Sequence, residues 1–152
     1  MKKILIVSAV IFIGIQFIPV DRSNPPVTEE IDAPSNITAI LRKSCYDCHS
    51  NQTEYPWYAY VAPVSFLVLK DVNEGRRRLN FSEWDMYAKE KREKIIEEIL
   101  EEINEGTMPL SLYTLVHPGA KLDPLKVKTL SDWANKKGGM EKTLRQEKER
   151  AD

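Results

Sequence analysis

The sequence predicts an all-α protein, because apolar residues recur at helical spacing along most of the chain and no segment alternates as a strand does. Proline and glycine interrupt this pattern where helices usually begin and end. The 152 residues suit one domain, and 42% of them are hydrophobic, which is enough to build a core. We expect this domain over residues 35–137, with a charged tail over 138–152.

The first segment is typical of a targeting signal. Lys2 and Lys3 precede residues 4–20, which carry no charge. No small-x-small cleavage site follows, so residues 1–20 are interpreted either as a cleaved signal peptide or as an uncleaved membrane anchor. A buried core helix is disfavoured because the run has no polar stripe. Both interpretations predict an exported protein, either periplasmic or anchored to the outer face of the cytoplasmic membrane.

Residues 21–34 contain three prolines among polar residues and predict an extended tether. Ser35 or Asn36 is expected to cap a short helix that runs directly into Cys45. Three longer helices are expected after it. The first lies over 63–78, with Pro63 in its first turn. The second lies over 83–104, where Ser82 and Asp85 form a capping box at its start and Gly106 ends it. The third lies over 124–136, with Leu125, Leu130 and Trp133 inward, and ends at Gly138-Gly139.

Five consecutive residues, Cys-Tyr-Asp-Cys-His from Cys45 to His49, form C-x-x-C-H, the attachment sequence of c-type haem. The spacing suits this chemistry, because two thiols can reach the two vinyl groups on one edge of the macrocycle. The imidazole that follows can then lie beneath the ring and bind the iron. The sequence therefore predicts one haem c per chain, bound covalently through Cys45 and Cys48 and ligated by His49.

Two other uses of the cysteines compete with this interpretation. A redox-active C-x-x-C normally accompanies a βαβ pattern, and the sequence predicts no strands. A structural zinc site needs four ligands, and His117 is the one residue left to join Cys45, Cys48 and His49. The chain has no further cysteine, which excludes a disulfide framework. Haem binding accounts best for the three adjacent residues.

The sixth iron ligand is expected to be Met108. Electron carriers usually pair His with Met, whose thioether raises the reduction potential. Among the four methionines, Met108 is the one that lies in a loop, between Gly106 and a proline that stiffens the backbone. Two alternatives stay open: Met108 fills the core, or His117, whose imidazole also binds ferric iron, is the ligand.

Two further residues are candidates for contact with the haem. Trp57 belongs to an aromatic cluster at residues 55–60, which walls the haem or packs as ordinary core. Arg76 begins a run of three arginines, which pairs with the haem propionates or is a solvated charge run. Both interpretations remain open for each residue.

These residues resemble the haem-binding domain family, exported bacterial proteins with cytochrome c character. The resemblance covers roughly residues 34–136 and includes CYDCHSNQTEYPWYAYVAPVS, EGRRRLNFSEW and GTMPLSLYTLVHPGAKL. It implies covalent haem at Cys45 and Cys48, axial His49, and Met108 as distal ligand, although Met-Pro-Leu stands here where Met-Pro-Pro is expected. The expected fold is a cytochrome c-like helical domain around one covalent haem, preceded by the signal or anchor helix.

The function predicted from these features is single-electron transfer by an exported monohaem c-type cytochrome, an electron carrier rather than an enzyme. Its partners would be other redox proteins, and the membrane if residues 4–20 anchor the chain. The alternative is a peroxidase-like haem enzyme or a haem-based gas or redox sensor, which would need an open sixth position. The formal net charge of −1 argues against nucleic acid as a partner.

Overall fold

The computed structural model describes the backbone of residues 1–151 and the side chains of residues 1–137. Over this range the chain is helical, which confirms the all-α prediction, and its one strand-like feature is an isolated parallel bridge between Glu29 and Glu83. The elements in chain order are α1 (Lys2–Ile15), α2 (Ser35–Ser44), α3 (Tyr46–His49), η1 (Trp57–Tyr60), α4 (Val64–Arg78), η2 (Trp84–Met86), α5 (Lys89–Asn104), α6 (Ser111–Val116), η3 (Pro118–Ala120) and α7 (Pro124–Ala151).

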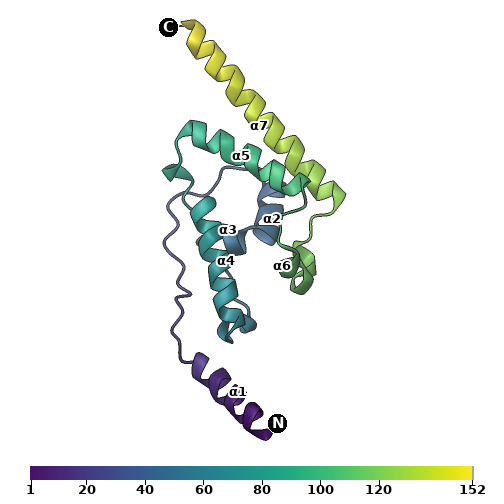
Figure 1. Ribbon diagram of the computed structural model, residues 1–152. Coiled ribbons are helices and arrows are strands. Elements are labelled where there is room, and N and C mark those ends of the chain that lie inside the picture. The colour runs from purple at the N-terminus through teal and green to yellow at the C-terminus, as the bar shows by residue number, and fades with distance from the viewer. Residues whose placement is uncertain (152) are drawn as a thin grey trace.

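Helices α2 to α6 gather in the middle of the molecule, while α1 lies at one end and α7 extends away at the other (Figure 1). The buried core combines residues of α2, α3, η2, α5 and α7 with residues of the connecting segments, and α7 packs along α5. Its buried members are Ile31, Ile37, Leu41, Tyr46, Leu79, Phe81, Trp84, Ile95, Ile96, Ile103, Leu130 and Ala134.

Helix α2 runs directly into Cys45, as predicted, and buries Ile37, Leu41 and Ser44. The predicted cap is wrong, because Pro34 is the N-cap residue and no side chain caps the helix. Proline fits this boundary, since its fixed φ suits the start of a helix and it has no N–H to satisfy.

Helix α4 agrees closely with the prediction, whereas the helix expected over 83–104 is split. Residues 84–86 form the 3-10 helix η2, and α5 begins at Lys89. The expected capping residues serve tertiary contacts instead: the Asn51 N–H donates to the Ser82 hydroxyl, and the Thr28 hydroxyl donates to the Asp85 carboxylate.

The segment predicted as a tether is extended but packs on the domain. The backbone N–H groups of Thr28 and Ile31 donate to the carbonyls of Ser82 and Phe81, and Ile31 is buried. These contacts explain the break at Ser82, because the chain there pairs with residues 28–31 and is not free to start a helix.

Helix α7 begins at Pro124, as predicted, where the Lys126 N–H donates to the Asp123 carboxylate at 2.9 Å. It continues to Ala151, so the predicted end at Gly138-Gly139 is wrong. The segment after the glycines is rich in Glu, Lys, Arg and Gln, whose high helix propensity offsets a glycine cost of about 1 kcal/mol each. Leu125 was expected inward and instead is 73% exposed.

Helix α1 is the N-terminal apolar segment, and none of its residues is buried. Among the described residues, no helix combines the length and the apolar character needed to cross a membrane.

Candidate functional site

The C-x-x-C-H residues form a single helical turn. Helix α2 ends at Ser44, and the N–H groups of Cys48 and His49 then donate to the Cys45 carbonyl, at 3.2 and 2.9 Å. Residues at i, i+3 and i+4 of a helix share one face. The local fold therefore sets both sulfurs and the imidazole on the same side of the chain.

The imidazole of His49 is oriented by the end of α4. Its Nδ1 lies 3.1 Å from the Gly75 carbonyl oxygen and 3.2 Å from that of Leu79, so Nδ1–H donates to these acceptors. Within the described part of the chain, Nε2 has no hydrogen-bond partner. This is the usual arrangement of a metal-binding histidine, in which one ring nitrogen is held by a carbonyl and the other is left for the metal.

Burial lowers the pKa of His49, and the two carbonyl contacts oppose this shift only in part. The ring is therefore neutral at pH 7, which is the protonation state that binds iron.

Gly75 makes the close packing of α4 on the motif possible. A Cβ atom at this position would lie 2.4 Å from the Cys48 carbonyl oxygen and 3.1 Å from the Cys48 Cβ. Because no side chain fits there, glycine lets the Gly75 carbonyl approach His49. Sequence analysis did not single out this residue, although a glycine inside a predicted helix is a signal of close packing.

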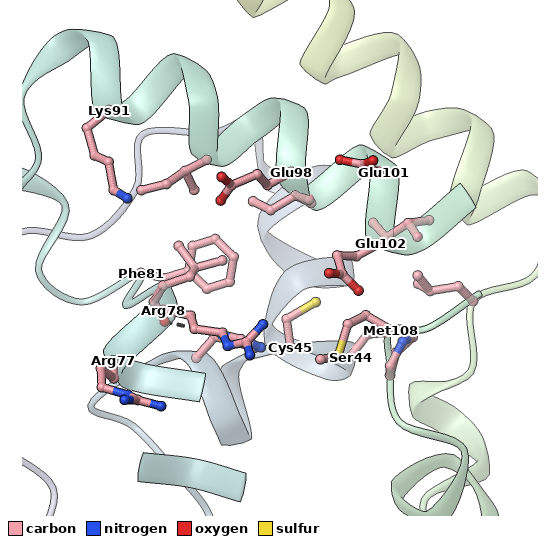
Figure 2. Close-up of a pocket in the computed structure, with 17 residues that line it drawn as sticks. Ser44, Cys45, Arg77, Arg78, Phe81, Lys91, Glu98, Glu101, Glu102 and Met108 are labelled. Carbon is pink, nitrogen blue, oxygen red and sulfur yellow. Dashed lines mark hydrogen bonds between the residues drawn. The ribbon is translucent and has the colours of Figure 1, made fainter. Parts of the chain in front are cut away.

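A cavity of about 550 Å³ opens in front of the motif, between α5 and the C-terminal end of α4 (Figure 2). Cys45, His49 and Met108 line it, and the same three residues line an adjoining cavity of about 200 Å³ together with Cys48. Apolar side chains form much of the larger wall: Leu79, Phe81, Ile95, Ile99, Ile103, Pro109 and Leu122. The structure thus brings both predicted thioether residues and both predicted axial ligands to two adjoining cavities, the larger of which has the size of a cofactor pocket.

Met108 reaches this space because of how α5 ends. Gly106 adopts φ +71°, the left-handed conformation that closes many helices, and the Met108 N–H then donates to the Glu102 carbonyl at 3.2 Å. The backbone therefore turns back at Gly106, which confirms the prediction that this glycine closes the helix. In Figure 2, Met108 and Cys45 lie on the same side of the opening.

The cavity is rimmed by charges from two helices. Arg77 and Arg78 of α4 and Lys91 of α5 supply the cations, while Glu98, Glu101 and Glu102 of α5 supply carboxylates. Arg76, the arginine predicted to contact propionates, lies elsewhere. Its guanidinium donates to the carbonyls of Ser23 and Ser50 and to the side chains of Asn24 and Thr53. It therefore fixes residues 23–24 to the loop after His49.

Trp57 also lies outside the cavities that contain His49 and Met108. Its side chain is 78% exposed and lines a separate groove, which Cys48 also lines. The prediction that an aromatic loop at residues 55–60 packs inward therefore fails for Trp57 and for Tyr60, which is 60% exposed. The 3-10 turn η1 points both rings outward.

His117, the alternative axial ligand, is held away from His49. Its Nε2 lies 2.6 Å from the Tyr58 hydroxyl, and its ring stacks on Tyr113 with centroids 4.6 Å apart. The four residues of the zinc interpretation are not brought together, and the described residues contain no group of three or more Cys, His, Asp or Glu placed to hold a metal ion.

The thiols themselves do not resemble those of a redox-active pair. Burial raises the pKa of Cys45 to about 12, and burial together with the Asp47 carboxylate raises the pKa of Cys48 to about 12. Redox C-x-x-C motifs work with a lowered thiol pKa, because the thiolate is the nucleophile. Protonated, half-buried thiols agree better with a structural or covalently modified role.

The motif is also tied to the segment after Met108. The Tyr113 hydroxyl of α6 donates to the Asp47 carboxylate at 2.7 Å, and the second carboxylate oxygen accepts the Glu54 N–H at 3.2 Å. Sequence analysis missed both Asp47 and Tyr113, because nothing in their spacing indicates that they meet. This bond links the C-x-x-C-H motif to α6, the helix that follows Met108.

Replacing Tyr113 with phenylalanine should therefore weaken the link while keeping the stacked ring. We expect the free energy of unfolding to fall by about 1–2 kcal/mol, because a half-buried hydrogen bond to a carboxylate is lost. Denaturant titration measures this change, and Tyr60→Phe, at an exposed hydroxyl, serves as the matched control. Equal stability of the two variants would contradict a role for the Tyr113–Asp47 bond.

Comparison with known protein families matches residues 10–136 to the Haem-binding domain family. The match spans most of the chain, so the protein belongs to the Haem-binding domain family and binds haem. No curated protein and no solved structure matches the sequence.

Proposed function

We propose that the protein is an exported monohaem c-type cytochrome that carries single electrons, with haem bound covalently to Cys45 and Cys48. The observation that carries this proposal is the convergence of Cys45, Cys48, His49 and Met108 on one pair of adjoining cavities. Haem would supply one-electron redox chemistry at this site.

The residues of the chain would bind the haem, orient its ligands and exclude water. The Gly75 and Leu79 carbonyls hold the His49 ring and leave Nε2 for a metal, and the turn after α5 brings Met108 to the same cavities, so these two residues would hold the iron. Phe81 and the isoleucines of α5 line the cavity and would exclude water from the face of a bound haem. Held by His49 and Met108, the haem would exchange single electrons, a reaction that needs no acid or base from the protein.

The two arginines that line the cavity suit the acidic edge of a haem. Arg77 and Arg78 would pair with the propionates, in place of the Arg76 that the sequence indicated, whereas Glu98, Glu101 and Glu102 would not. The uncharged residues 4–20 support export, with the domain in the periplasm or anchored at the outer face of the cytoplasmic membrane. The partners proposed are redox proteins on that side of the membrane.

Haem staining of a denaturing gel, combined with a count of free thiols in denaturant, tests the covalent attachment. The matured wild-type chain should keep its stain and present no free thiol. A Cys45→Ala, Cys48→Ala double variant should lose the covalent stain entirely. Ser44→Ala is the matched control, because the buried Ser44 hydroxyl faces the same cavity without a hydrogen-bond partner in the described structure. A wild-type chain that gives up its haem intact to acidic acetone overturns the proposal.

A further inference from the structure

One end of the molecule carries an apolar surface that the haem site does not use. It is formed by η1, the start of α4 and α6, and we name it the η1–α4–α6 face. Trp57 and Leu115 are 78% and 76% exposed, and Leu112 and Tyr60 are each 60% exposed. The remaining members are Val61, Val64, Leu67 and Val116.

Five of these eight side chains come from distant parts of the chain and line one groove of about 410 Å³. They are Trp57 of η1, Val64 and Leu67 of α4, and Leu112 and Val116 of α6. Asp47, Glu54 and Asp71 also line it. Cys48 lines the same groove, so the face lies directly over one of the two haem-attachment residues. Exposed apolar patches of this kind usually mark an interaction site.

Helix α1 is held beside this face by specific hydrogen bonds. The Gln16 side chain accepts the Ala62 N–H at 2.9 Å and donates to the Ala62 carbonyl at 3.1 Å. Arg22 donates to the Ala59 carbonyl at 2.8 Å, and its guanidinium lies over the Tyr60 ring. The two ends of residues 16–22 are thus fixed to η1 and to the start of α4, and Figure 1 places α1 at that end of the molecule.

The side chains of α1 indicate which kind of partner the η1–α4–α6 face and α1 contact. The helix buries none of its residues, and Ile4, Leu5 and Val10 are between 64% and 70% exposed. A helix that binds a protein groove needs one apolar face, whereas a helix that is apolar on every side is suited to lipid. Its 14 residues extend about 21 Å, which reaches into a hydrocarbon core of roughly 30 Å.

The flanking residues fit the boundary between lipid and water. Lys2 and Lys3 can contact anionic headgroups, and the Trp57 and Tyr60 rings are of the kind that collects at the membrane interface. Arg22, stacked on Tyr60, keeps its charged group beside that ring.

We propose that α1 and the η1–α4–α6 face bind the same lipid bilayer, with α1 in the apolar layer and Trp57 and Tyr60 at the headgroups. The domain is then held with its Cys48 side toward the membrane, which places that edge of the haem next to membrane-embedded redox partners. This last consequence rests on the proposed function, whereas the lipid contact does not.

Fluorine NMR of the full chain labelled with 5-fluorotryptophan tests the contact. The protein is placed in nanodiscs of phosphatidylethanolamine and phosphatidylglycerol, and the iron is kept reduced. A doxyl-labelled lipid should broaden the Trp57 resonance severalfold, while a soluble gadolinium chelate should leave it sharp. Buried Trp84 and half-buried Trp133, which packs against the core from α7, are internal controls that the lipid label should not broaden. Trp57→Phe assigns the resonance.

Two outcomes overturn the proposal. Broadening of Trp57 by the soluble chelate and not by the lipid label means that the face is open to water. Protection from both agents means that a second copy or another protein covers it. Because the resonances report position whether or not haem is attached, failure here is separate from failure of the gel stain.

Discussion

Replacing Met108 with alanine is expected to abolish the far-red sulfur-to-iron charge-transfer band and to lower the reduction potential by on the order of 100 mV. The band arises from a thioether bound to ferric iron, and a thioether ligand favours the reduced state. Optical spectra and a redox titration of the purified, haem-loaded protein measure both changes.

Met86 provides the matched control for this experiment. It is 72% exposed on η2 and does not line the cavities that contain His49, so Met86→Ala should leave the band and the potential unchanged. A wild-type spectrum of high-spin, five-coordinate iron would contradict Met108 ligation. That result would favour the haem enzyme or sensor, for which an open sixth position is required.

Replacing Gly75 with alanine is expected to destabilise the protein by about 2–3 kcal/mol, the upper part of the usual range for overpacking. The new methyl group would lie 2.4 Å from the Cys48 carbonyl oxygen, so α4 must move away from the C-x-x-C-H turn. The Gly75 carbonyl moves with it and weakens its bond to His49 Nδ1. Denaturant unfolding of the haem-loaded protein gives the stability, and its spectrum reports any change at the axial histidine.

Gly119→Ala is the control for the added methyl group itself. Its nearest neighbour would be the Cε atom of Lys43, at 2.9 Å, which is the mobile part of a flexible side chain. This variant should stay within about 0.5 kcal/mol of the wild type. If Gly75→Ala is equally mild, the close approach of α4 to the motif does not govern stability.

Local signals in the sequence predicted helices well where local chemistry decides their bounds. The spacing of apolar residues and Pro63 predicted α4 almost to the residue, and Gly106 was correctly placed at the end of α5. The prediction failed at Ser82 and Asp85, because their side chains bond to other segments in place of capping a helix. It failed again at Gly138-Gly139, where strong helix formers carry α7 onward.

In the candidate site, too, the predictions succeeded for residues adjacent in sequence and failed for contacts between distant residues. Cys45, Cys48 and His49 are adjacent in sequence, so one helical turn is enough to set them on one face. Arg76 and Trp57 were chosen for their residue type, yet the structure uses Arg76 to hold residues 23–24 and turns Trp57 outward. Residue type indicates which contacts a side chain can make and does not indicate which neighbour it will meet.

The sequence by itself determined the all-helical class, the C-x-x-C-H motif and membership of a haem-binding family, since each depends on residues close together in the chain or on the pattern as a whole. Only the tertiary structure decided that Met108 and not His117 shares a cavity with His49, that Gly75 orients the imidazole, and that Tyr113 bonds to Asp47. These are contacts between distant segments, and packing, which no local pattern encodes, brings those segments together.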